Sequence, residues 1–269
     1  MKMILNCRRH HYLARVGIFL ILAALIAAIP GCGYYGPRPT LPDYWEIRDW
    51  YDLHAIYGDR DGMRASHILM NDLDSATAGY AELAGPVANQ GKGWRPMGAL
   101  GVLGGGFAGS LDGRGYEIRD LFINRPDEDA VGLFRSLSSG GIIMNVRLVN
   151  ADVTGYTRVG GLVGSKGGTI DNCHFSGSVA GAGNVGGLVG YNAGPVTNSY
   201  SAGSVAGGWA VGGLAGRTRG AINNCHFTGS VTGDWKVGGL VGHSDSLGTV
   251  TNSYALGNVS GGGQAGGLV

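Results

Sequence analysis

Histidine and tyrosine recur at equivalent positions in the second half of this chain, and they are the side chains there best suited to contacting a ligand. Successive positions lie 26, 26 and 28 residues apart: His174, Tyr200, His226 and Tyr254. If neighbouring repeats stack, the four rings form one column, and an aromatic column offers a groove for a sugar or a peptide. A packing ladder between repeats explains the same column without a ligand, so both interpretations stay open.

A metal site is a third use of these histidines, because Cys173 precedes His174 and Cys225 precedes His226. The two Cys-His pairs are two repeats apart, which is roughly 9.6 Å at the strand spacing of a β-sheet. Metal–ligand bonds are about 2 Å long, so the two pairs are too far apart to share an ion. The separation also exceeds the ~7 Å limit between Cα atoms of a disulfide. We predict two free, mostly buried thiols, no metal and no cofactor.

Catalytic residues are not evident in the sequence. A zinc peptidase needs the helical pattern His-Glu-x-x-His, which does not occur, and His10-His11 falls in the N-terminal leader. Polysaccharide hydrolases built on β-helices need clustered carboxylates. From Gly155 onward there is no Glu, and the three Asp residues take different positions in the repeat: Asp171, Asp234 and Asp245. The sequence therefore predicts a protein that is not an enzyme.

The first 31 residues predict export. Four basic residues precede an apolar run at 16–29, which is typical of a secretory signal peptide and shorter than the ~20 residues of a spanning helix. The run ends in Ile-Pro-Gly-Cys at Cys32 and resembles a bacterial lipoprotein signal, although Pro30 stands where a small residue is usual. The resemblance implies lipidation of Cys32 and a membrane partner. An ordinary cleavable signal or an uncleaved anchor is the alternative.

Composition narrows the class of protein. Glycine supplies 53 of 269 residues, about three times the usual ~7%, yet there is no Gly-X-Y period of the kind collagen requires. A hydrophobic content of 44% and a formal charge of +1 argue against disorder. Four of the 20 basic residues leave with the leader, so 16 remain against 19 acidic ones. That balance argues against a nucleic-acid partner.

A tandem repeat organises the chain. The block Val-Gly-Gly-Leu-Val-Gly at 159–164 returns, with one Ala, in steps of 26 residues, and a variant follows after 28 at Ala265. Fixed periods of this size indicate a solenoid. Glycines would break helices at this spacing, whereas short β-branched stretches between Gly and Asn favour strands. We predict a right-handed parallel β-helix, or β-solenoid, of about six coils counted from Phe107, with a small α/β N-terminal cap.

Particular positions should build this fold. Leu162, Ile170 and Val179, with their equivalents, should form the core, whereas strict alternation leaves open whether Val159 also faces inward. The recurring asparagines should form a side-chain ladder at a turn, each amide bonding to the next coil: Asn172, Asn198, Asn224 and Asn252. Asp49 is the expected N-cap of a short helix that runs to residue 57.

The Gly-Leu-x-Gly blocks resemble the bacterial GLUG repeat, with matches at Gly161, Gly187, Gly213 and Gly239. Such repeats occur in surface proteins, in adhesin-like proteins and in non-catalytic parts of IgA-specific metallopeptidases. The resemblance implies an exported, lipid-anchored surface scaffold, structural or adhesive, with an extracellular glycan or protein as partner. The alternative is the non-catalytic N-terminal repeat region of a larger secreted peptidase or carbohydrate-active enzyme.

The predicted segments follow from these patterns: a signal peptide at 1–31, a tether at 32–42, an N-terminal capping region at 43–105, degenerate coils at 106–158 and GLUG-type repeats at 159–269. The last repeat stops part-way, so we expect this chain to be truncated at its C-terminus.

Overall fold

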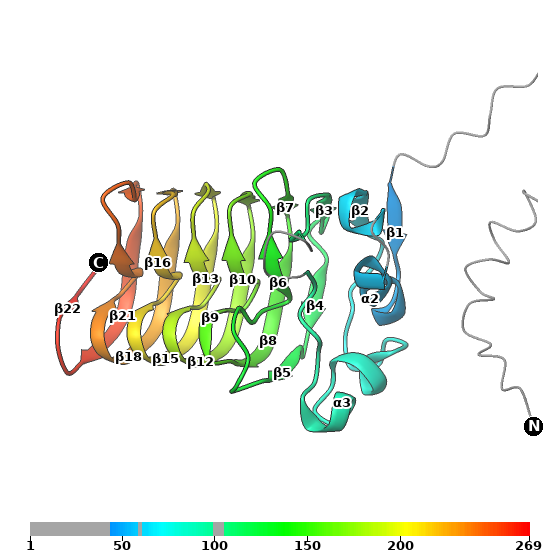
Figure 1. Cartoon of the computed structure of the whole chain (residues 1–269), viewed down its shortest axis with the longest axis horizontal. Helices are drawn as coiled ribbons and strands as arrows, with labels where there is room; N and C mark the ends of the chain where they lie inside the picture. The colour runs from blue at the N-terminus through cyan, green and yellow to red at the C-terminus, as the bar shows by residue number, and fades with distance from the viewer. Residues whose placement is uncertain (1–43, 59–60, 99–104) are drawn as a thin grey trace, which may run out of the picture. The chain divides into compact units, whose positions relative to one another are not determined.

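Like residues of neighbouring coils pair with one another, and this pairing builds three parallel sheets. The computed structural model describes residues 44–58, 61–98 and 105–269, and Tyr44–Val269 form one compact unit. Within that unit the coils lie side by side in chain order from β1 to β22 (Figure 1). From β12 onward the pairing follows the sequence repeat: Val179 lies opposite Val205, and Val205 opposite Val231.

The first sheet contains β1 (Trp45–Ile47), β2 (Ser66–Leu69), β3 (Ser110–Asp112), β7 (Ile142–Met144), β11 (Thr169–Asp171), β14 (Val196–Thr197), β17 (Ala221–Asn223) and β20 (Thr249–Thr251). The second contains β6 (Phe134–Leu137), β10 (Val163–Lys166), β13 (Val189–Asn192), β16 (Ala215–Thr218) and β19 (Val241–Ser244). The third contains β4 (Glu117–Arg119), β5 (Phe122–Asn124), β8 (Arg147–Thr154), β9 (Thr157–Gly160), β12 (His174–Gly186), β15 (Tyr200–Gly212), β18 (His226–Gly238), β21 (Tyr254–Gly261) and β22 (Ala265–Gly266).

The all-β solenoid class is confirmed, but the stack is longer than the predicted six coils, because the first sheet has eight strands. β1 and β2 lie in the expected capping region and pair with the stack: Trp45 is opposite His67, and Ser66 is opposite Ser110. Four short helices interrupt this region: α2 (Trp50–Gly58), η2 (Gly62–Arg64), η3 (Tyr80–Ala84) and α3 (Ala88–Gly91). These insertions break the 26-residue spacing, so periodicity alone does not reveal the first two coils.

Helix α2 begins as its sequence predicts. The backbone N–H of Asp52 donates to Oδ1 of Asp49 at 2.8 Å, which satisfies one of the unpaired N–H groups of the first turn. Trp50, Leu53 and Ile56 are buried against the first coils. Across the described ranges of the chain, no helix is long and apolar enough to span a membrane.

The predicted core columns are buried. Leu162, Leu188, Leu214 and Leu240 are fully buried, whereas Leu268 of the last copy is 38% exposed. The Ile170 and Val179 columns are likewise buried in every coil except the last, where Val250 and Val259 are partly buried. Val159 is buried too, which settles the point that alternation left open. A solenoid has one continuous core because each coil covers the apolar edge of its neighbour.

A bend after Gly160 explains how Val159 and Leu162 both point inward. β9 ends at Gly160 and β10 begins at Val163, so the chain turns a corner between two sheets and strand alternation is interrupted there. A Cβ on Gly160 would lie 2.5 Å from the carbonyl oxygen of Val163 and 2.6 Å from the backbone nitrogen of Gly190. The corner therefore depends on the absence of a side chain.

The asparagine ladder is present, and the backbone supplies a second reason for it. Asn172, Asn198, Asn224 and Asn252 all have φ between 49° and 52°, in the left-handed region that asparagine tolerates better than most residues. The amide of Asn224 donates to Oδ1 of Asn198 at 2.8 Å. The ladder departs from its expected regularity twice: Asn198 donates to Oδ1 of Asp171, and Asn252 donates to Oδ1 of Asn223, each at 2.8 Å.

At the equivalent repeat positions 173, 199, 225 and 253, cysteine alternates with serine from coil to coil. Cys173 and Cys225 are free and buried, as predicted, and serines occupy the intervening coils. The backbone N–H of Cys173 donates to Oγ of Ser199 at 3.0 Å, and that of Cys225 donates to Oγ of Ser253 at the same distance. Each cysteine therefore lies next to a serine of the following coil, whose hydroxyl oxygen accepts the hydrogen bond of the cysteine backbone N–H.

Candidate functional site

The four predicted ring positions form one column on the outer face of the third sheet. His174, Tyr200, His226 and Tyr254 are the first residues of β12, β15, β18 and β21, and consecutive members are paired in register. The residues that follow His174 and His226 are Phe175 and Phe227, which point into the core. Strand alternation thus directs the rings outward. We call these four side chains the ring column.

The rings of the column stack on one another. The centroids of Tyr200 and His226 are 4.7 Å apart with the rings 6° from parallel, and those of His226 and Tyr254 are 5.1 Å apart at 5°. His174 and Tyr200 are closer, at 3.9 Å, and tilted by 58°. Because the faces of the inner rings are covered by neighbouring rings, a ligand would meet their edges. This differs from the flat aromatic groove that the sequence suggested.

The histidines of the column are neutral at pH 7. Burial, together with the positive charge of Arg147 and the ring of His226, lowers the pKa of His174 to about 4. Burial also lowers the pKa of His226. A neutral imidazole has one N–H donor and one acceptor nitrogen, so the column carries hydrogen-bonding groups without net charge.

A cluster of ion-paired side chains adjoins the His174 end of the column. Arg147 of β8 lies opposite His174, and Glu117 of β4 lies opposite Arg147. Nη2 of Arg147 is 3.0 Å from Glu117, which also pairs with Arg119. The column therefore changes along its length from an ion-paired end to neutral rings.

The edges of the column are open to hydrogen bonding. Tyr200 and His226 are partly exposed and Tyr254 is half exposed. Nδ1 of His174 is buried without a hydrogen-bond partner. The column can consequently exchange hydrogen bonds with a polar ligand laid along the third sheet.

The other sites considered from sequence do not join the column. Cys32 lies outside the described residues. Asp171 accepts hydrogen bonds from Thr197 and Asn198, Asp234 lies in β18, and Asp245 is paired with Arg217. In residues 44–58, 61–98 and 105–269, no group of three or more His, Cys, Asp or Glu side chains is placed to hold a metal ion.

A buried lysine is the feature that sequence reasoning missed. Lys166 ends β10 and is 2% exposed, and burial lowers its pKa to about 7. Its Nζ donates to the carbonyl oxygens of Gly168 and Pro195 at 2.8 and 3.0 Å and to Oδ1 of Asn192 at 2.8 Å. Asn192 in turn donates to Oγ1 of Thr218 at 2.9 Å. The only sequence signal was a polar residue recurring at this position of the repeat.

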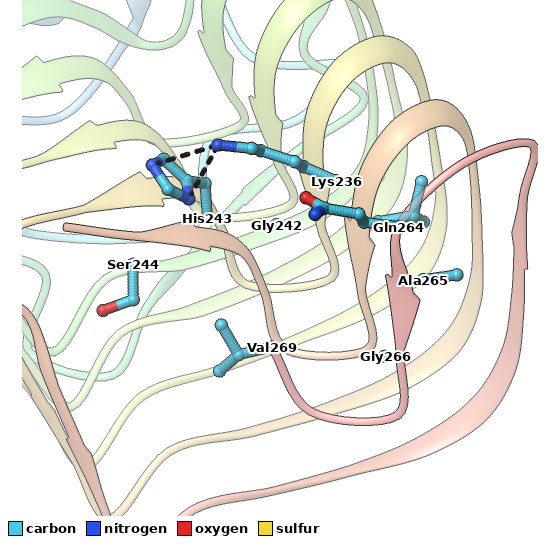
Figure 2. Close-up of a pocket in the computed structure, with 9 residues that line it drawn as sticks. Lys236, Gly242, His243, Ser244, Gln264, Ala265, Gly266 and Val269 are labelled. Carbon is cyan, nitrogen blue, oxygen red and sulfur yellow. Dashed lines mark hydrogen bonds between the residues drawn. The ribbon is translucent and has the colours of Figure 1, made fainter.

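A second polar group lines a pocket beside β19 and β22. The side chain of Lys236 points toward the ring of His243 (Figure 2). Its Nζ lies 3.4 Å from both ring nitrogens of His243 and 5.5 Å from the ring centroid of Trp209. Burial lowers the pKa of His243, and the positive charge of Lys236 lowers it further. Nε2 of His243 is 3.4 Å from Asp245, whose carboxylate is already bound by Arg217. These contacts make a cationic and aromatic surface rather than an acid–base pair.

Comparison with known families identifies the repeat. A family model described as the GLUG motif matches residues 155–180, 207–232 and 233–260. These segments are GLUG motif repeats. Each matched GLUG segment supplies parts of the third sheet, and the unmatched coil between the first and second segments pairs with its neighbours in the same register.

Two curated relatives match part of this chain. Halomucin of Haloquadratum walsbyi is 37% identical over 156 residues, which is 58% of this chain and 2% of the relative. A protein of Evansella cellulosilytica, proposed to be a Gly-rich membrane protein, is 38% identical over 107 residues, or 39% of this chain and 11% of the relative. The chain thus spans only a small part of the length of either relative.

A solved structure shares the solenoid fold. It is a protein of Bacteroides ovatus proposed to be an immunoglobulin A1 protease, with a TM-score of 0.59 and 23% identity, over 83% of this chain and 70% of that one. At this level of identity the likeness concerns the fold alone.

Proposed function

We propose that this chain is an exported, lipid-anchored cell-surface repeat protein whose GLUG solenoid is a scaffold for binding an extracellular glycan along the ring column. The observation that carries the proposal is the column itself: four outward ring side chains in register on consecutive coils, with open polar edges. The names of the two relatives, a mucin and a membrane protein, support a place at the cell surface.

The chemistry of the column favours a neutral, hydroxyl-rich ligand. The rings carry donors and acceptors without net charge, and their centroids are 4.7 and 5.1 Å apart along the GLUG coils. This rise is close to the length of one sugar unit in an extended chain, so successive hydroxyl groups can meet successive ring edges. A charged ligand would find no counter-charge among the rings.

The test is binding of a neutral-glycan array by the wild-type chain and by Tyr200→Leu/His226→Leu. Leucine keeps the bulk of the ring but removes its polar edge. A matched control replaces two exposed residues of the same strands, Ser204→Ala and Ser230→Ala. We expect the Leu variant to bind the best glycan about tenfold more weakly, equal to about 1.4 kcal/mol, and the control to bind as the wild type does. Equal affinity in all three proteins would refute the column as the contact surface.

The anchor is proposed from the lipoprotein-like sequence at Cys32. In the producing organism, radiolabelled palmitate should enter the wild-type chain and not Cys32→Ala. Cys7→Ala is the matched control, because Cys7 lies in the leader, and it should label normally. Equal labelling of wild type and Cys32→Ala would refute lipid anchoring and leave the binding proposal untouched.

A second candidate is the non-catalytic repeat region of a larger secreted enzyme. The fold shared with the proposed immunoglobulin A1 protease of Bacteroides ovatus favours it. Reading the encoding gene downstream of Val269 distinguishes the two. A His-Glu-x-x-His segment there would support the enzyme, whereas a stop codon after one closing repeat would support the surface scaffold.

A further inference from the structure

A cationic pocket lies outside the GLUG repeats, between α3 and β6. Four basic side chains and one carboxylate line it: Lys92, Arg95, Arg125, Arg135 and Glu128. The lining residues therefore carry a formal charge of +3. They come from segments far apart in the sequence, so the cluster is a product of the coil stacking rather than of one basic run.

The floor of the pocket is a built charge network. Arg125 is 8% exposed, and its Nε donates to the carbonyl oxygen of Trp94 at 2.9 Å. Its Nη1 donates to Oε1 of Glu128 at 2.7 Å, while Arg135 donates to Oε2 of the same carboxylate at 2.6 Å. Both oxygens of Glu128 are thus engaged, and one negative charge faces two guanidinium groups. The floor therefore carries one positive charge without a counter-charge. Buried cations normally have a partner of opposite charge.

The rim adds two more cations. Within the described ranges, no acidic side chain lies within ion-pair distance of Lys92 or Arg95. The guanidinium of Arg95 lies over the ring of Tyr57, 4.9 Å from its centroid, which orients its plane while its N–H edge stays available. Lys92 lies within a tight loop that is held by a hydrogen bond from Asn89 to the carbonyl oxygen of Gly93 at 2.7 Å.

We infer that this pocket binds the carboxylate group of an acidic saccharide. Guanidinium groups fit planar carboxylates with paired hydrogen bonds. The carboxylate of a ligand would balance the positive charge of the floor that Glu128 does not neutralise. The exposed amide of Gln90, on the pocket wall, offers a donor and an acceptor to sugar hydroxyls. This site is chemically distinct from the neutral ring column, and its test does not depend on whether the ring column binds a ligand.

Isothermal titration of the full chain with D-glucuronate tests the assignment, with D-glucose as the neutral comparator and sodium sulfate as the inorganic one. The variant Lys92→Gln/Arg95→Gln removes the two exposed cations and leaves the buried network in place. Arg219→Gln is the matched control, an exposed arginine of a distant coil. We expect glucuronate to bind, glucose not to bind, and the double variant to raise the Kd for glucuronate about tenfold.

Four outcomes would overturn the inference. The first is the absence of glucuronate binding by the wild type. The second is an unchanged Kd in the double variant, which would move the contact elsewhere. The third is sulfate binding as tightly as glucuronate, which would reduce the pocket to a general anion site. The fourth is loss of binding in Arg219→Gln as well, which would mean that net charge, not this pocket, attracts the anion.

Discussion

Lys166 donates a hydrogen bond of 2.8 Å to Asn192 of the next coil, and both side chains are buried. The carbonyl oxygens of Gly168 and Pro195 are the other hydrogen-bond partners of the ammonium, and none of these three partners is an acid. Neutral oxygen acceptors compensate a buried charge only partly. The buried ammonium of Lys166 therefore destabilises the folded state, and the size of this effect should depend on pH.

Lys166→Met should change how stability varies with pH. Burial lowers the folded-state pKa from 10.5 to about 7, so between these values the unfolded chain binds the proton more tightly than the folded one. The contribution of Lys166 to the free energy of unfolding must therefore rise with pH across this window. Between pH 7 and 10.5, we expect the free energy of unfolding of the wild type to rise by about 2–4 kcal/mol relative to that of Lys166→Met.

Denaturant titrations at several pH values measure this difference, and Lys92→Met serves as the exposed control. Groups that titrate equally in wild type and variant cancel in the comparison. A difference between wild type and Lys166→Met that stays constant with pH would show that Lys166 has an ordinary pKa in the folded protein.

Asn224 allows the two roles of the asparagine corner to be separated. Its φ is 52° and its amide donates to Asn198. Asn224→Gly keeps the left-handed backbone but loses the hydrogen bond, at a cost of about 1 kcal/mol. Asn224→Ala loses both and should cost about 1–2 kcal/mol more than the glycine variant. Equal stability of the two variants in denaturant titrations would exclude backbone conformation as a reason for asparagine at this corner.

Much of the fold was predictable because the same side chains recur in each coil. The Leu162 and Val179 columns, the asparagine ladder and the free cysteines all follow from stacking like on like, and the structure confirms them. The ring column could be placed for the same reason, whereas its edge-on presentation could not, because ring tilt depends on local packing. Whether the column binds a ligand stays a prediction.

What sequence reasoning missed lies where periodicity fails or where a position varies between coils. β1 and β2 are separated by inserted helices, so no spacing marks them as coils. Lys166 aligns with Asn192 and Thr218, and a lysine in such a position is usually exposed. The inward direction of Val159 required knowledge of the bend at Gly160, which alternation along a straight strand does not contain.

Gly160→Ala should damage that bend. The added Cβ would meet backbone atoms at 2.5–2.7 Å, and backbone in a stacked coil cannot move without shifting the next coil. We expect a loss of about 2–4 kcal/mol in the free energy of unfolding. Gly167→Ala is the matched control, since its Cβ would have its nearest neighbour at 3.6 Å, and its change should stay within about 0.5 kcal/mol. If the two variants are equally stable, the corner does not need glycine.

The two core cysteines should be unreactive until the solenoid unfolds. Burial raises the pKa of Cys173 to about 12 and that of Cys225 to about 11, and the thiolate is the reactive form. In a Cys7→Ala/Cys32→Ala background, a thiol reagent such as Ellman's reagent at pH 8 should label neither cysteine in the native protein. It should label both after denaturation without reductant. Fast native labelling would mean that the coils open readily, and denatured protein with no free thiol would mean a disulfide that the separation of these coils forbids.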